Sequence, residues 1–170
     1  IEVPIIGDSI YEGDETLNLV LYDVVGAGFP SGFKLTASGA IKDDEPLISA
    51  TDMKVTEGAR GAVTKMVFPV RLSNAALQDV TFKYETVQST GAAVATPDKD
   101  FTSVKDGTLT IPKGSTMGYI SIDILDDLLS EGNETFNLRL FDPVGGAFAK
   151  GDSLVIVGTI IDNEPVAAFG

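Results

Sequence analysis

The 170-residue sequence contains no cysteine, no histidine and no tryptophan. The absence of cysteine excludes disulfides, thiolate nucleophiles and cysteine-ligated metal sites. The absence of histidine removes the commonest general base, the Ser-His-Asp triad and the usual zinc sites. With no nucleophile paired to a base, we expect that the chain is not an enzyme.

Basic residues are scarce, because 12 Lys and Arg stand against 25 Asp and Glu, for a net charge of −13. Nucleic acid is not expected as a partner, since binding it requires a basic face. An anionic membrane surface is disfavoured for the same reason. No apolar run approaches the ~18 residues of a membrane span, so we also expect no direct membrane insertion. Cations are the natural partners of this charge.

The chain repeats itself. Residues 1–46 align without gaps to residues 120–165, at a fixed offset of 119, and about 21 of the 46 positions are identical. We therefore predict that residues 1–46 are the C-terminal part of one repeat, that residues 47–165 are a complete repeat and that residues 166–170 begin another. A period of ~120 residues suits whole sandwich domains better than short solenoid units. Neighbouring repeats of the same chain are the expected structural partners.

Apolar and polar residues alternate with a period of two over residues 66–72, 80–84, 120–124 and 136–140. Such alternation is typical of strands with one buried face. Further candidate strands bring the prediction to about seven strands in residues 47–165 and about three in residues 1–46. An all-β fold, an immunoglobulin-like antiparallel β-sandwich, is the simplest way to bury one face of each strand.

Acidic residues cluster where the predicted strands end. Asp126 and Asp127 directly follow one strand, and Asp162 follows the last. Alternate strand ends of an antiparallel sandwich share a pole, and like charges ~4 Å apart cost on the order of 4 kcal/mol per pair at an effective dielectric near 20. Hard oxygen ligands without His or Cys favour Ca²⁺, which takes 6–8 oxygens. The charge pattern leaves open the alternative that these are ordinary solvated turn residues.

Several stretches of residues 47–165 resemble the Calx-beta repeat. The most distinctive is IDILDDLLSEGNETF at 122–136, and the others are VTEG at 55–58, FPVRLS at 68–73, VTFKYET at 80–86, GTLTIPKG at 107–114 and TIIDNE at 159–164. Residues 1–46 are similar to the last three strands of the same family. The resemblance implies tandem sandwich domains of the kind found in exchangers, an integrin subunit and large bacterial surface proteins, with a calcium site at one pole.

By position, the resemblance implies calcium ligands at the ends of several strands of the complete repeat: Glu57, Asp100, Asp126, Asp127, Glu131, Asp162, Asn163 and Glu164, with Glu134 as a weaker candidate. Leu128 and Asn163 stand where the strongest calcium-binding members carry Asp. Both changes lower the negative charge, so we expect fewer ions or weaker binding, toward dissociation constants of ~10⁻⁴–10⁻³ M.

The partial repeat keeps only part of this set, namely Asp8, Glu12, Asp43 and Asp44. Gly7 replaces the first Asp of the pair, and the first-strand Glu and the long-loop Asp have no counterpart. We therefore expect no complete calcium site from residues 1–46 alone.

These observations favour a calcium-binding structural or adhesion repeat of a large bacterial cell-surface or secreted protein, and so an extracellular or cell-surface location. The alternative is a metal-independent β-sandwich spacer or protein–protein interaction module. The strands of residues 1–46 would leave unpaired edges and an apolar face, carrying Leu17, Leu19, Leu21 and Ile41. Such a face predicts a homodimer through the partial repeat, or else packing of these strands on the complete one.

Overall fold

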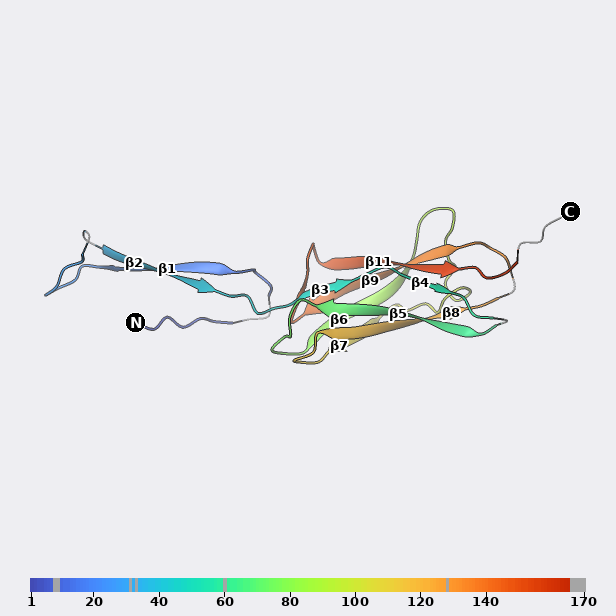
Figure 1. Ribbon diagram of the computed structural model, residues 1–170, viewed down its shortest axis with the longest axis horizontal. Helices are drawn as coiled ribbons and strands as arrows, with labels where there is room; N and C mark the ends of the chain where they lie inside the picture. The colour runs from blue at the N-terminus through green and yellow to red at the C-terminus, as the bar shows by residue number, and fades with distance from the viewer. Residues whose placement is uncertain (8–9, 31, 33, 60, 128, 166–170) are drawn as a thin grey trace.

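Every regular element in the described part of the chain is a β-strand (Figure 1). The computed structural model describes residues 1–170 except 8, 9, 31, 33, 60, 128 and 166–170. A two-stranded hairpin and a sandwich of two sheets lie end to end along the long axis. The predicted all-β sandwich is therefore confirmed. Within these same residues, no helix is suited to crossing a membrane.

The sandwich consists of a four-stranded and a five-stranded sheet. The first has the order β10–β3–β5–β8, with β3 (Leu47–Ala50), β5 (Val63–Leu72), β8 (Met117–Leu125) and β10 (Ala147–Phe148). The second has the order β4–β11–β9–β6–β7, with β4 (Met53–Thr56), β6 (Val80–Gln88), β7 (Gly107–Ile111), β9 (Glu134–Val144) and β11 (Ser153–Ile161). β3 and β4 follow each other closely but belong to different sheets. The Asp52 carboxylate marks this crossing by accepting the Val157 N–H at 2.8 Å.

Phenylalanines fill the centre of the sandwich. Phe68, Phe101 and Phe136 are fully buried. Phe101 stacks on Phe136 with ring centroids 4.4 Å apart, and Phe68 meets Phe136 edge-on at 6.2 Å. Phe101 comes from the loop between β6 and β7 rather than from a long strand. Its burial therefore fixes that loop, and the adjacent Asp100, against the core.

The hairpin consists of β1 (Glu15–Tyr22) and β2 (Lys34–Ile41). Its register equals that of β9 and β11 at the 119-residue offset, since Glu15 pairs with Ile41 and Glu134 pairs with Ile160. Residues 1–7 form no strand, so two of about three predicted strands are present among the described residues of this part. Their counterpart β8 pairs with β5, whereas residues 1–7 pair with no strand of the described residues.

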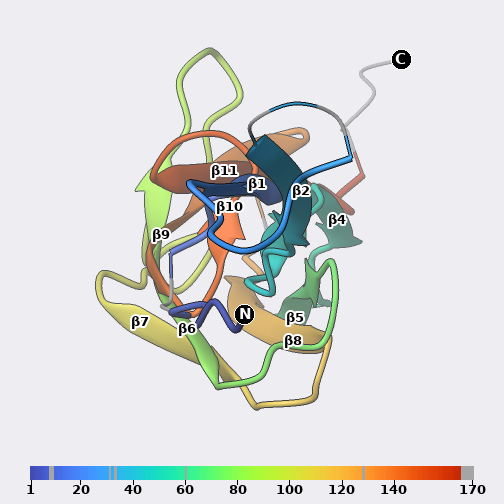
Figure 2. The same cartoon turned by 90° about the vertical axis from the view of Figure 1, so that its left-hand side faces the viewer.

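Hydrogen bonds attach the segment after the hairpin to the sandwich. The Ala147 N–H donates to the Pro46 carbonyl at 3.1 Å, and Asn74 Nδ2 donates to the Asp44 carbonyl at 3.4 Å. Pro46 is buried at this joint. Figure 2 looks along the long axis, with β1 and β2 in front of the sandwich. The joint thus holds the end of one repeat against the start of the next.

Candidate metal centre

The core-facing rows of several strands continue into acidic residues at one end of the sandwich. Alternate residues of a strand face the same way. Glu57 lies two residues beyond Val55 of β4, and Asp126 lies two residues beyond Ile124 of β8. Glu134 begins the core-facing row of β9. The period of two that builds the core therefore also directs these carboxylates toward one another.

Three carboxylates of this end form a first triad, Glu57, Asp126 and Glu164, in which one oxygen of each lies within 4.8 Å of the others. Asp126 Oδ2 accepts the Gly61 N–H at 2.5 Å. Asp126 Oδ1 and Glu164 Oε2 are buried and accept no hydrogen bond from the described residues. Because an unpaired buried polar atom costs free energy, these two oxygens favour a positive partner.

A second triad, Asp100, Glu131 and Glu134, also brings its carboxylate oxygens within 4.8 Å. The loop before β7 holds Asp100 firmly, since Asp100 Oδ2 accepts the Thr96 N–H at 2.6 Å. The Leu125 N–H donates to the Asp100 carbonyl at 2.9 Å, which ties this loop to the end of β8. Six carboxylates of the pole thus lie in two groups.

Two glutamates of the triads titrate near neutral pH. Burial raises the pKa of Glu57 to about 7, and the neighbouring Glu164 carboxyl adds to this rise. The hydrogen bond from the Asn163 N–H acts in the opposite direction and lowers the pKa. Burial, with the neighbouring Asp100, raises the pKa of Glu134 to about 7. Without a cation, the pole therefore relieves its own repulsion by holding protons. A bound cation would compete with those protons.

Asp127 and Asp162, both predicted ligands, lie outside the triads. Asp127 is exposed, and its Oδ1 accepts the Leu129 N–H at 2.6 Å. The Asp162 carboxylate accepts the Gly132 N–H at 2.6 Å and the Glu164 N–H at 3.0 Å. These N–H bonds lower the pKa of Asp162, with that of Glu164 the largest cause. Both side chains are therefore engaged by backbone groups of the pole loops.

Asn163, the third predicted ligand outside the triads, joins the ends of β4 and β11. Its Nδ2 donates to the carbonyls of Glu57 at 3.0 Å and Gly58 at 2.5 Å. Its backbone N–H donates to Glu57 Oε1 at 3.2 Å. A carboxylate at this position would lack the two amide donors. The backbone donors Gly61 and Thr96 have no residue-type signal in the sequence, because any non-proline residue offers an N–H.

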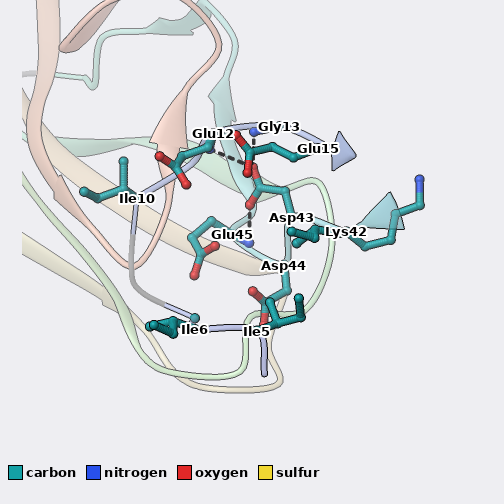
Figure 3. Close-up of a pocket in the computed structure, with 12 residues that line it drawn as sticks. Ile5, Ile6, Ile10, Glu12, Gly13, Glu15, Lys42, Asp43, Asp44 and Glu45 are labelled. Carbon is teal, nitrogen blue, oxygen red and sulfur yellow. Dashed lines mark hydrogen bonds between the residues drawn. The ribbon is translucent and has the colours of Figure 1, made fainter. Parts of the chain in front are cut away.

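The predicted ligands that the structure describes in the partial repeat, Glu12, Asp43 and Asp44, lie near the joint with the sandwich. Figure 3 shows Asp43 and Glu45 beside the backbone of Glu12 and Gly13. No carboxylate triad forms among the described residues of this part. Three predictions lie outside the described residues: Asp8 as a ligand, Leu128 as a substitution that weakens binding, and residues 166–170 as the start of a further repeat.

Two curated relatives are extracellular or cell-surface proteins by name. The chain is 27% identical over 181 residues to "Extracellular matrix protein 3" of Lytechinus variegatus, covering 99% of this chain and 6% of that protein. It is 28% identical over 181 residues to "Adhesion G-protein coupled receptor V1" of Danio rerio, covering 98% of this chain and 3% of that protein. The chain thus spans only a small part of both relatives.

Solved structures of Calx domains share the fold. The apo-form Calx CBD1 domain matches with a TM-score of 0.57 and 24% identity, over 70% of this chain and 98% of that domain. CBD12 from CALX1.2 matches with a TM-score of 0.56 and 24% identity, over 68% of this chain and 44% of that one. The Calx-beta domain family itself matches residues 1–30 and 42–164. With most of its length matched, the chain belongs to the Calx-beta family.

Proposed function

We propose that residues 47–165 are a calcium-binding structural module of an extracellular or cell-surface matrix or adhesion protein. Calcium at the pole would stabilise the sandwich by offsetting the repulsion between its carboxylates. The two buried carboxylate oxygens without a hydrogen-bond donor, Asp126 Oδ1 and Glu164 Oε2, carry this proposal. Both belong to the first triad.

The donor set fits Ca²⁺. Each triad offers three carboxylates and no nitrogen or sulfur ligand, which is the chemistry that hard divalent cations prefer. Backbone carbonyls and water would complete a shell of 6–8 oxygens. One ion per triad would replace the protons that Glu57 and Glu134 hold near neutral pH. Glu134, a weaker candidate by sequence, is proposed as a full ligand of the second triad.

The structural role is supported by the family. Calx-beta domains are binding and structural modules, and the curated relatives are an extracellular matrix protein and an adhesion receptor by name. We therefore propose an extracellular or cell-surface location, a repeated arrangement and no enzymatic activity. Bacterial origin stays a prediction, since both relatives come from animals. Pairing of two chains through residues 1–46 also stays a prediction.

A thermal melt with calcium and with chelator tests the proposal. Calcium at about 100 times its dissociation constant stabilises the folded state by ~2.7 kcal/mol per site. For a domain of this size the expected rise in melting temperature is about 5–10 °C. Mg²⁺ at the same concentration should give a much smaller rise, because it demands a smaller and more regular oxygen shell.

Paired variants locate the effect. Asp126→Asn removes charge from the first triad and should abolish about half of the calcium-dependent rise, the part that the ion at this triad contributes. Asp152→Asn changes an exposed acid in the turn before β11 and should leave that rise unchanged. An identical melting temperature in calcium and chelator for the unmodified chain would support the metal-independent spacer and reject calcium binding.

A further inference from the structure

The Asp162 carboxylate joins three backbone or side-chain donors of the pole. It accepts the Gly132 N–H at 2.6 Å, the Glu164 N–H at 3.0 Å and the Ser130 hydroxyl at 3.3 Å. Glu164 belongs to the first triad, and Gly132 is adjacent to Glu131 of the second. One side chain thus links the backbones that carry a member of each triad.

The partial repeat contains the same arrangement 119 residues earlier. Asp43 accepts the N–H groups of Gly13 and, at 3.1 Å, of Glu45, which are the counterparts of Gly132 and Glu164. Figure 3 shows the Asp43 carboxylate against the backbone nitrogens of Glu12 and Gly13. Here the Glu12 N–H, at 2.8 Å, replaces the serine hydroxyl as the third donor.

A further bond also recurs at the same offset. The Asp162 N–H donates to Asn133 Oδ1 at 3.2 Å, and the Asp43 N–H donates to Asp14 Oδ1 at 3.3 Å. Gly132 has φ +80°, in the left-handed region that glycine adopts freely. Its counterpart Gly13 has φ +78°. The turn, its glycine and its aspartate therefore form one unit of local structure, which we call the aspartate clamp.

The clamp forms in the partial repeat without any triad beside it. Residues 1–46 contain no counterparts of Glu57 and Asp100, and Gly7 stands at the counterpart of Asp126. In the described residues of this part, the clamp therefore forms without carboxylates that converge beside it. The shared reason is that an aspartate at this position satisfies N–H groups that the turn leaves unpaired.

We infer that Asp162 is a positioning residue that fixes Glu164 and the turn bearing Glu131 relative to each other, and so couples the two triads, instead of serving as a calcium ligand. The coupling half of this inference rests on the proposed function. The clamp itself does not depend on calcium. Residues that orient metal ligands typically change affinity by about 10–100-fold when they are altered.

Melts in chelator test the clamp by itself. Asp162→Asn removes one charge and weakens the bonds to two N–H groups, and should lower the melting temperature without calcium by about 3–6 °C. If Asp162 acted without calcium mainly by repelling other carboxylates, the same substitution would raise the melting temperature instead. An unchanged or raised melting temperature would therefore overturn the inference, whether or not the protein binds calcium.

Calorimetric titration of the full chain with CaCl₂ tests the coupling. Asp162→Asn should preserve the number of ions bound and raise every dissociation constant by roughly tenfold. Gly132→Ala leaves every carboxylate in place but disfavours the left-handed turn, and should give the same pattern. Loss of one whole ion in Asp162→Asn, with Gly132→Ala unchanged, would identify Asp162 as a ligand.

Asp43→Asn is the matched control, because it alters the same clamp in the partial repeat, which contains no triad among its described residues. It should leave the number of ions and their affinities unchanged. If the unmodified chain shows no heat with CaCl₂, the proposed calcium function fails and the coupling fails with it. The melts in chelator would then still test whether Asp162 stabilises the turn through its bonds to backbone N–H groups.

Discussion

The pair β1–β2 and the pair β9–β11 are two copies of one sequence pattern, with the same strand register and different surroundings. Leu138 of β9 is fully buried, whereas its counterpart Leu19 of β1 is only partly buried. The hairpin therefore takes its turn and register from its own residues. Burial and the convergence of acids depend on strands that only the complete repeat supplies.

A backbone conformation near the ends of β1 and β9 is shared by the two copies. Asp23 follows β1 and its counterpart Asp142 lies near the end of β9, and both have positive φ, at 53° and 49°. Left-handed backbone at a non-glycine residue is uncommon, and Asp is one of the few residues that tolerates it. Its recurrence at the same offset shows that this conformation is encoded locally and does not need the core around it.

The largest expected effect comes from truncating matched leucines. Leu138→Ala should cost about 3–4 kcal/mol of unfolding free energy, because it opens a cavity in a closed core. Leu19→Ala should cost less than about 1 kcal/mol, since its side chain already meets solvent. Denaturant titration measures both. An equal cost at the two positions would mean that another surface covers the hairpin, and light scattering would then show whether it is a second chain.

Matched glutamates at the starts of β9 and β1 give the next effect. Glu134→Gln should remove about half of the calcium-dependent rise in melting temperature, because it removes one carboxylate from the second triad. Glu15→Gln, the same change at the offset position, should leave that rise unaltered. Melts in calcium and in chelator separate the two. An effect of Glu15→Gln as large as that of Glu134→Gln would place a cation site in the hairpin.

Acidity offers a third distinction. Glu57 and Glu134 have ordinary pKa values near 4.5 that the fold raises to about 7, so the folded state binds more protons between these values. Their contribution to metal-free stability is therefore full below about pH 4.5 and is lost as the pH rises through about 7. The melting temperature in chelator should fall from about pH 5 to pH 8. Glu57→Gln with Glu134→Gln should flatten that fall, and a fall of undiminished size in the double variant would refute this assignment.

The smallest effect is expected at Asn163, whose counterpart in the partial repeat is Asp44. Asn163→Asp makes the complete repeat resemble the partial one at this position. It removes the amide bonds to Glu57 and Gly58 and adds a charge, so stability in chelator should fall by about 1–2 kcal/mol. Calcium affinity should rise by several-fold, as measured by calorimetry. Weaker calcium binding in this variant would show that the amide cross-link matters more to the site than the added charge.

Much of this architecture is accessible from the sequence. The alternation ending in Ile122 and Ile124 predicts both the strand and the direction of Asp126, and the 119-residue offset predicts the shared register of the two strand pairs. The sequence could not divide the acids into two triads, because that division depends on distances between loops. Nor could it separate Asp162, which binds backbone N–H groups, from Glu164, which offers an unpartnered oxygen.

The structure of residues 1–7 also depends on context that a local pattern does not contain. Their alternation matches that of β8, yet they form no strand, because a strand needs a neighbour to hydrogen-bond. The same physical limit applies to Glu12. Glu12 matches Glu131 by position. Among the described residues of the partial repeat, however, no other carboxylates lie close enough to Glu12 to form a triad.

Calorimetric titration with CaCl₂ at about pH 7, in two buffers of different ionisation enthalpy, tests the central claim most directly. The account predicts binding in both buffers, with heats that differ because Glu57 and Glu134 release protons as calcium arrives. Asp126→Asn should reduce the number of ions bound. Absence of binding up to about 10 mM calcium, well above the range expected for extracellular modules, would contradict the claim that the acidic pole is a calcium site.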